Sequence, residues 1–235
     1  MEDSLRSLRD TAPSSMTLFG ALYVSSKTLI SSSGSTWNTW RLVLIFWSLP
    51  LISGSYGPDV DLDKLKDFHR RRLQVLVEAG PDLLAFETIP NKIEAQACVE
   101  LLEEQNIEVP SWICFSSVDG ENAPSGERFK ECLDIINKSN KVQAVGINCA
   151  PPHFIEALIC KFKELTKKAI VVYPNSGEVW DGRAKRWLPS KCFDDDKFKL
   201  FASRWRDAGA KLIGGCCRTT PSTTQAISNV LKERS

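Results

Sequence analysis

The sequence lacks an excess of charge of either sign, a long apolar run and a large number of histidines. It contains 30 Lys plus Arg and 29 Asp plus Glu, and this balance gives no electrostatic reason to expect nucleic acid or an anionic membrane as a partner. The apolar stretch from Leu42 to Ile52 is shorter than the ~20 residues that a membrane-spanning helix needs. Only two histidines are present, His69 and His153. Neither has a partner at metal-ligand spacing, so we expect both to be structural or surface residues.

A secretory signal peptide is also not readable at the start of the sequence, which bears on its eight cysteines. An even number of cysteines is typical of disulfide frameworks in short secreted chains, but this chain has 235 residues. Five of the eight lie within apolar runs or helical patterns. We therefore expect free thiols, a reducing compartment and a cytoplasmic location. Ordinary packing is the expected role of Cys98, Cys114, Cys132 and Cys160, and Cys192 in a polar loop is expected to be incidental.

From Asp61 onward, helical patterns alternate with short apolar runs. The runs predict five strands, over 83–88, 111–116, 142–149, 169–174 and 211–215. The patterns predict six helices, over 61–79, 91–105, 125–137, 152–166, 195–208 and 221–232. Continuous apolar strands between helices indicate a parallel sheet that is buried on both faces. A doubly wound sheet would normally also have a Gly-rich phosphate loop, and none is present, so we predict an α/β fold of the (β/α)8 TIM-barrel type.

Three cysteines follow the ends of two predicted strands. Cys149 ends the strand that begins at Val142, and the adjacent Cys216 and Cys217 follow the last strand. Three protein ligands leave the fourth tetrahedral position of a zinc ion open, which is typical of a catalytic site. A thiol that takes this position is held as the thiolate, the nucleophilic form, so such a site suits alkyl transfer to sulfur. Burial as small packing residues is the competing interpretation of all three cysteines.

Polar residues at the other strand ends are candidate substrate contacts. Glu87 ends a hydrophobic strand, where its carboxylate could bind the ammonium group of an amino acid; an exposed loop acid or a helix-cap partner is the alternative. Thr88 and Asn148 occupy the same level of the predicted barrel. Asn175, before Ser176 and Gly177, could line the same opening or form a turn. The acidic run 194–196 is expected to be a helix N-terminus and not a metal site.

Four segments together resemble the homocysteine S-methyltransferases. They are residues 86–90 (FETIP), 146–149 (GINC), 173–178 (YPNSGE) and 214–221 (GGCCRTTP). The likeness is closest to the plant enzymes that use S-methylmethionine as methyl donor, and it runs from about Gly54 to Ser235.

This resemblance implies zinc-dependent transfer of a methyl group to L-homocysteine, which forms methionine and serves methionine synthesis. It implies that Cys149, Cys216 and Cys217 hold Zn²⁺, which binds the homocysteine sulfur, and that Glu87 helps to hold the amino acid. Relatives use S-methylmethionine, S-adenosylmethionine or betaine as donor, so the resemblance leaves the donor open. A structural zinc protein is a further interpretation, but it would need a fourth protein ligand and no candidate stands out.

Residues 1–53 differ from the rest of the sequence. They are rich in Ser and Thr and show neither a convincing helix cap nor strand alternation. Only residues 54–57 look like the tail of a third family strand, and the family's N-terminal D-G-G motif, which supplies an acidic residue to the homocysteine pocket, is not found. Ordinary codons for residues 1–23 and 27–53 can nevertheless be chosen so that another reading frame spells family-like N-terminal segments in the right order.

We therefore hypothesise that residues 1–53 are an aberrant, out-of-frame segment and that residues 54–235 are a homocysteine-binding part of a β/α barrel. On this hypothesis the barrel is incomplete, with its first strands missing or replaced, and residues 1–53 form irregular or marginal structure. An incomplete barrel exposes strand edges, so lowered stability and weak or absent activity are expected relative to a complete family member. The alternative function is a truncated, catalytically inactive isoform that retains only part of the zinc and homocysteine site.

Overall fold

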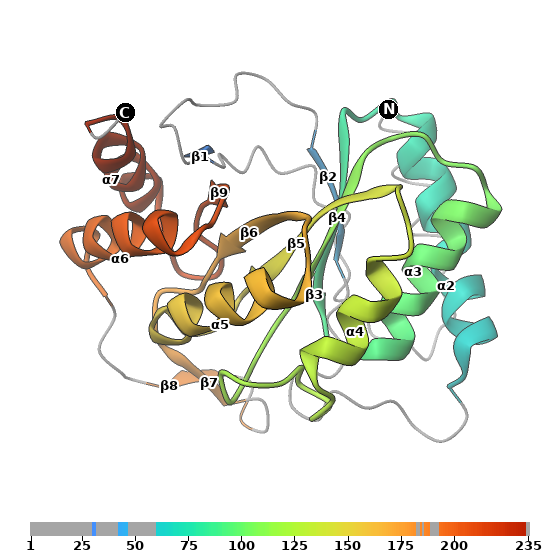
Figure 1. Ribbon diagram of the computed structural model, residues 1–235, viewed down its shortest axis with the longest axis horizontal. Coiled ribbons are helices and arrows are strands. Elements are labelled where there is room, and N and C mark those ends of the chain that lie inside the picture. The colour runs from blue at the N-terminus through green and yellow to red at the C-terminus, as the bar shows by residue number, and fades with distance from the viewer. Residues whose placement is uncertain are drawn as a thin grey trace.

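The computed structural model describes residues 60–181, 184, 186–188 and 193–233, together with two short strands in the amino-terminal part. Its main feature is one seven-stranded sheet in the order β1-β9-β6-β5-β4-β3-β2 (Figure 1). A small two-stranded sheet of β7 (Val179–Asp181) and β8 (Arg186–Leu188) accompanies it. The order is open because β1 and β2 lie at opposite edges.

Five strands of the large sheet run parallel to one another and match the five predicted strands. They are β3 (Leu83–Ile89), β4 (Ser111–Phe115), β5 (Val142–Asn148), β6 (Ala169–Tyr173) and β9 (Leu212–Ile213). All six predicted helices are present as α2 (Leu62–Glu78), α3 (Lys92–Glu104), α4 (Phe129–Ile136), α5 (Pro152–Leu165), α6 (Asp195–Ala208) and α7 (Pro221–Lys232). The alternation confirms the predicted α/β fold, an incomplete barrel of parallel strands.

Two strands fall within residues 1–53. Strand β2 (Leu42–Phe46) runs parallel to β3, with Leu42 opposite Leu83, and β1 (Ile30–Ser31) runs antiparallel to β9. These two segments are therefore short edge strands and not irregular, and the expectation of marginal structure stays a prediction. A run of apolar, partly β-branched residues such as Leu-Val-Leu-Ile-Phe suits a strand at the end of a parallel sheet. The other residues of 1–53, and the suspected strand tail at 54–57, lie outside the described residues.

Helix starts follow the capping rules that the sequence suggested. Asp61, Asn91 and Asp194 each accept a hydrogen bond from the backbone N–H three residues ahead, and Thr220 forms a reciprocal capping box. The acidic run 194–196 is thus the start of α6, as expected. None of the helices in the described part of the chain is both long and apolar enough to cross a membrane.

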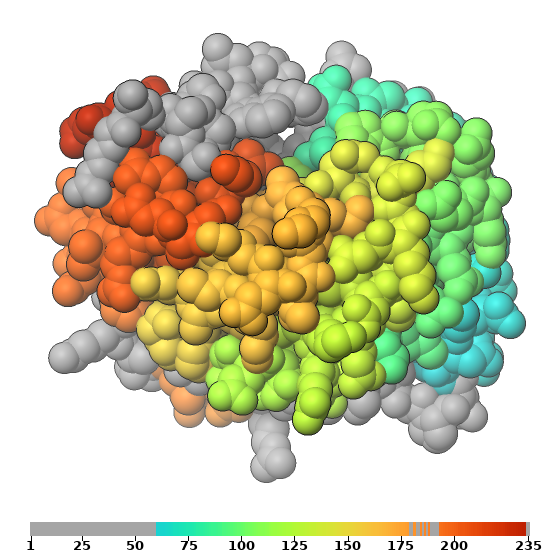
Figure 2. Space-filling view, in the orientation of Figure 1, coloured from blue at the N-terminus to red at the C-terminus, as the bar shows by residue number. Residues whose placement is uncertain are grey.

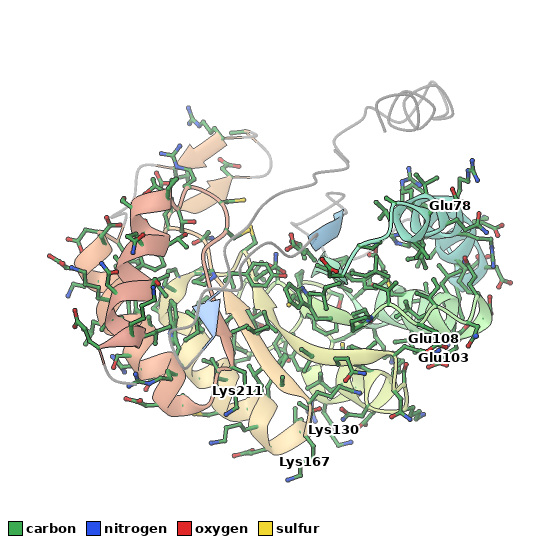
Figure 3. The ribbon with its side chains drawn as sticks, turned by 90° about the horizontal axis from the view of Figure 1, so that it is seen from above. Glu78, Glu103, Glu108, Lys130, Lys167 and Lys211 are labelled. Carbon is green, nitrogen blue, oxygen red and sulfur yellow. The ribbon has the colours of Figure 1, made fainter. Side chains whose placement is uncertain are left out.

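The sheet separates two apolar clusters. The larger cluster packs between the sheet and the helices, and includes the fully buried Phe86, Phe115 and Phe162. Successive side chains of a strand point to opposite faces, so the alternate residues form a second cluster on the inner face: Ala85, Trp112, Cys114, Ala144, Val171 and Tyr173. Seen from above, the helices lie around the outside of the curved sheet (Figure 3), and in the space-filling view their side chains cover that side continuously (Figure 2).

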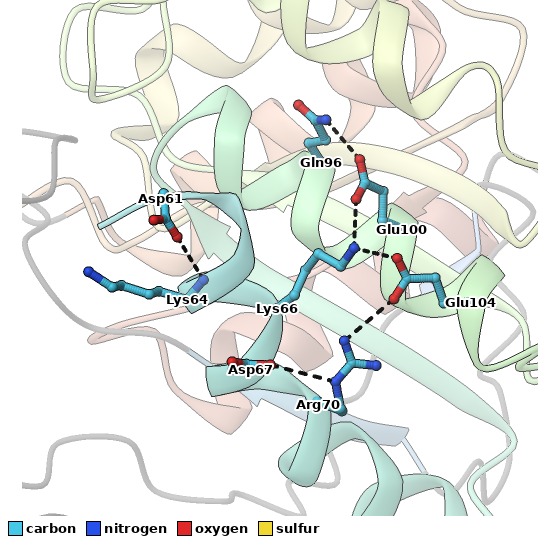
Figure 4. A network of polar contacts seen from close by, with 8 residues as sticks. All are labelled: Asp61, Lys64, Lys66, Asp67, Arg70, Gln96, Glu100 and Glu104. Atoms are coloured by element: carbon cyan, nitrogen blue, oxygen red, sulfur yellow. Dashed lines mark hydrogen bonds and ion pairs between the residues drawn. The ribbon is translucent and has the colours of Figure 1, made fainter. Parts of the chain in front are cut away.

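Helices α2 and α3 are joined by polar contacts on the surface and in the interior. Lys66 Nζ lies 2.9 Å from Glu100 Oε2 and also pairs with Glu104, which Arg70 contacts as well (Figure 4). These partly exposed pairs add little to stability because solvent screens them. Below them the buried His69 Nε2 lies 2.9 Å from Glu94 Oε1. His69 is therefore structural, and His153 is exposed, as the sequence indicated.

Candidate metal centre

The three cysteines singled out in the sequence meet at the carboxyl ends of the strands. Cys149 directly follows β5, and Cys216 and Cys217 lie between β9 and α7. Cys217 Sγ is 3.3 Å from Cys149 Sγ and 4.0 Å from Cys216 Sγ, and all three sulfur atoms lie within 4.8 Å of one another. Each cysteine is half-buried and forms no disulfide.

This geometry fits a tetrahedral zinc ion. Zn–S bonds of ~2.3 Å place two ligand sulfur atoms roughly 3.8 Å apart, within the observed range of spacings. In the part of the chain that the structure describes, this is the one group of three or more His, Cys, Asp or Glu that could hold a metal, and no fourth residue joins it. A site with three soft ligands and an open position suits a catalytic zinc better than a closed structural one.

The protein alone does not favour three thiolates at this place. Hydrogen bonds with Cys216 and Cys217, followed by burial, raise the pKa of the Cys149 thiol well above its ordinary value. A negative charge on either neighbour raises it further. A divalent cation reverses this effect because it stabilises each coordinated thiolate. The charge distribution of the cluster is therefore suited to binding a cation.

Residues 173–178, which begin with the last residue of β6, hold both cysteine-bearing segments through backbone hydrogen bonds. Cys149 N–H donates to Tyr173 O at 3.1 Å, and Cys216 N–H donates to Pro174 O at 2.7 Å. Cys217 O accepts from Ser176 N–H at 3.1 Å. Cys149 also has a φ of 55°, a left-handed conformation that is uncommon outside glycine. The segment 173–178 thus sets the positions of the three thiols relative to one another.

The Asn175 side chain takes part in the same arrangement. Its Oδ1 accepts from Gly177 N–H at 2.8 Å, and its Nδ2 donates to Cys149 O at 3.3 Å. Both hydrogen bonds serve the turn and the position of Cys149. The turn-forming role considered for Asn175 is therefore present, while its contact with a substrate stays a prediction.

Thr88 and Asn148 form a buried pair that joins the ends of β3 and β5. Asn148 Oδ1 accepts from Thr88 N–H at 2.8 Å, and Asn148 Nδ2 donates to Thr88 Oγ1 at 2.7 Å. Thr88 has a φ of 61°, which is costly for a β-branched residue and marks a sharp end to the strand. Glu87 beside it is 1% exposed, so it is not the exposed loop acid that was one interpretation of its sequence position.

The inner face below the cysteines contains a polar group that the sequence reasoning missed. Tyr173 OH accepts a hydrogen bond from Trp112 Nε1 at 3.2 Å. Burial, and then the charges of Cys114 and Glu87, raise the pKa of Tyr173 well above its ordinary value. The phenol therefore stays neutral. The alternation of Tyr173 with outward-facing residues in its strand is the signal that could have placed it here.

A cavity of about 650 Å³ lies at the other end of the strands. Asn140, Thr166 and Lys168 are among its lining residues, and it opens near the starts of β5 and β6. The cysteines lie at the carboxyl ends of the same strands, so this cavity is not part of the metal centre.

Comparison with known proteins shows the family to which this chain belongs. The family model described as Homocysteine S-methyltransferase matches residues 14–231. The chain belongs to the homocysteine S-methyltransferase family. Homocysteine S-methyltransferase 1 of Arabidopsis thaliana is 78% identical over 182 residues, which cover 77% of this chain and 56% of that protein. Selenocysteine Se-methyltransferase of Brassica oleracea var. italica is 52% identical over 182 residues, covering 77% and 53%.

A solved structure of a homocysteine methyltransferase shows the same fold. The metallated form of MmuM from Escherichia coli superposes with a TM-score of 0.64 at 33% sequence identity, covering 80% of this chain and 56% of that one. The chain thus spans a little over half the length of the relatives that it matches. The family-model match includes part of residues 1–53, and the division of the chain at residue 53 stays a prediction.

A second feature that the sequence reasoning missed is an ion pair beside the cysteines. Glu178, the last residue of the 173–178 segment, binds the guanidinium of Arg218 through both carboxylate oxygens. Both residues belong to segments that carry the family resemblance, which was the available signal. Their pairing spans 40 positions of the sequence and became visible only in the fold.

Proposed function

We propose that this chain transfers a methyl group to the sulfur of L-homocysteine and forms methionine, with Zn²⁺ held by Cys149, Cys216 and Cys217. The observation that carries the proposal is the convergence of three cysteine sulfur atoms within 4.8 Å, with no fourth ligand residue in the group. The preferred donor in this proposal is S-methylmethionine, because the sequence resembles the plant enzymes that use it and is 78% and 76% identical to two plant homocysteine S-methyltransferases. S-adenosylmethionine is the other donor to test. A cytoplasmic, reducing location would keep the three thiols available.

Zinc bound at these thiolates would lower the pKa of the substrate thiol and keep its sulfur nucleophilic at neutral pH. The chain's own residues bind and orient the substrate. The buried Glu87 carboxylate is suited to the ammonium group of the amino acid, and the Thr88–Asn148 pair fixes the strand end that carries it. Asn175 supports the proposed metal site by donating a hydrogen bond to the Cys149 carbonyl.

The proposed reaction is a direct transfer between two sulfur atoms. A lone pair of the homocysteine thiolate attacks the donor methyl carbon and forms a new C–S bond. The bond between that carbon and the donor sulfonium breaks, and its electron pair returns to the donor sulfur. With S-methylmethionine the donor leaves as the neutral thioether methionine, so both products are methionine and the thiol proton passes to solvent.

The test is a methyl-transfer assay with unlabelled S-methylmethionine and homocysteine labelled in its carbon chain, read by mass spectrometry. We expect labelled methionine from the wild-type chain and from Cys160→Ser, which removes an exposed cysteine away from the cluster. Cys217→Ser should lower the rate at least ~100-fold because it removes a ligand. Zinc binding without labelled methionine would favour the inactive-isoform alternative and would contradict the proposed activity.

A further inference from the structure

The ion pair of Glu178 and Arg218 connects two of the segments that build the metal centre. Arg218 Nη2 lies 3.0 Å from Glu178 Oε1, and Arg218 Nε contacts Oε2, so the contact is bidentate. Ser176 Oγ donates to Glu178 Oε2 at 3.0 Å. The Glu178 side chain is 9% exposed, whereas that of Arg218 is 49% exposed. The carboxylate is therefore fixed inside the protein, and the arginine reaches it from the surface.

The backbone at Arg218 needs such support. Its φ of 65° is in the left-handed region, which is unfavourable for a residue other than glycine. This residue directly follows Cys217, so its conformation sets where the Cys216–Cys217 turn ends. Thr219 closes the turn from the other side, because its Oγ1 donates to Cys216 O at 2.7 Å.

Besides the hydrogen bond from Cys216 N–H to Pro174 O, two contacts join the 173–178 segment to Cys217 and the residue after it. One is the backbone hydrogen bond from Ser176 N–H to Cys217 O at 3.1 Å, and the other is the Glu178–Arg218 pair. The first fixes the carbonyl of Cys217, and the second fixes the residue after it. Together they determine the direction of the Cys217 side chain, whose Sγ lies 3.3 Å from Cys149 Sγ.

We infer that Glu178 is a positioning residue of the metal centre: it holds Arg218 and thereby keeps the Cys217 thiolate in place for zinc. The inference rests on the metal site of the proposed function. Outer-shell partners of metal ligands typically change metal affinity 10–100-fold when they are altered. A pair in which one side chain is half exposed adds little to overall stability, so the effect on zinc should exceed the effect on unfolding.

The experiment measures zinc affinity of the full chain by competition with a chromophoric chelator. Glu178→Gln keeps the size of the side chain but removes the charge that the guanidinium binds, and we expect zinc to bind about 10–100-fold more weakly. The matched control is Glu108→Gln. Glu108 pairs with Lys141 at the amino end of β4, near the edge of the molecule in Figure 3, and its loss should leave zinc affinity unchanged.

A second readout uses cobalt in place of zinc. The thiolate-to-cobalt absorption reports the number and arrangement of bound thiolates, so Glu178→Gln should weaken or shift it while Glu108→Gln should not. If Glu178→Gln does not fold, Arg218→Lys tests the inference in its place. This variant keeps the positive charge but loses the bidentate contact, and about a 10-fold loss of zinc affinity is expected.

The outcomes separate this inference from the proposed function. Wild-type zinc affinity in Glu178→Gln, or in Arg218→Lys where the first variant does not fold, overturns the inference alone. A wild-type chain that binds no zinc overturns both. A similar loss of affinity in Glu108→Gln also overturns the inference, because the effect would then not depend on the position of Glu178.

Discussion

Replacing Asn148 with alanine removes both hydrogen bonds that join the ends of β3 and β5. The Asn148 side chain is completely buried, and its two partners are the N–H and the hydroxyl of Thr88, at 2.8 and 2.7 Å. A buried N–H left without a partner costs about 1–3 kcal/mol, and the second hydrogen bond adds about 1 kcal/mol. We therefore expect Asn148→Ala to lower the free energy of unfolding by about 2–4 kcal/mol.

The assay is urea unfolding followed by tryptophan fluorescence. With a slope of about 3 kcal/mol per M, the expected loss moves the midpoint down by about 1 M. The control is Asn140→Ala, which truncates an exposed asparagine on the loop before β5 and should change the free energy of unfolding by less than about 0.5 kcal/mol. A change as small as this in Asn148→Ala would refute the view that the pair holds the strand ends together.

Two further predictions concern strand spacing and pH. Gly146→Ala should lower the free energy of unfolding by about 3 kcal/mol or more, and the thermal midpoint with it, because a Cβ at Gly146 would lie 1.7 Å from the Val171 carbonyl oxygen of the neighbouring strand. An unchanged midpoint would contradict this close approach. Burial would raise the pKa of Asp119, but hydrogen bonds from the backbone N–H groups of Asn122 and Glu121 outweigh it and lower the pKa to about 2. The stabilising contribution of the Asp119 carboxylate is therefore complete above its ordinary pKa of 3.8 and is lost as the pH falls toward 2. When the free energy of unfolding is measured between pH 5 and 2, Asp119→Asn should lose less stability than wild type. Equal losses in the two proteins would refute the assignment.

The regular elements could be predicted because their patterns are local. Apolar runs and helical spacing predict the five central strands and six helices, and the side-chain caps at Asn91 and Thr220 explain where two of those helices begin. The cysteine cluster could be predicted because residues at the carboxyl ends of parallel strands share one edge of the sheet. The positions of these cysteines at the strand ends were enough to predict that Cys149 lies near Cys216 and Cys217.

The rest depended on contacts between distant segments. The hairpin of β7 (Val179–Asp181) and β8 (Arg186–Leu188) has strands of only three residues, too short to show a period. The pairing of β2 with β3 depends on a free sheet edge, which a local pattern does not reveal. The left-handed conformation of Thr88 and the Glu178–Arg218 pair arise only when the strand-end loops pack together. Of these features, the Glu178–Arg218 pair lies beside the cysteine cluster.

The measurement that tests the account most directly is the zinc content of the purified, monodisperse chain, with Cys216→Ser and Cys160→Ser prepared in parallel. Since the three clustered sulfur atoms fit one ion, the account predicts about one zinc per chain in the wild type and in Cys160→Ser, and a loss of zinc in Cys216→Ser. A wild-type chain without zinc, or a Cys216→Ser variant that binds zinc as tightly as wild type, would contradict the claim that this cluster is a metal centre.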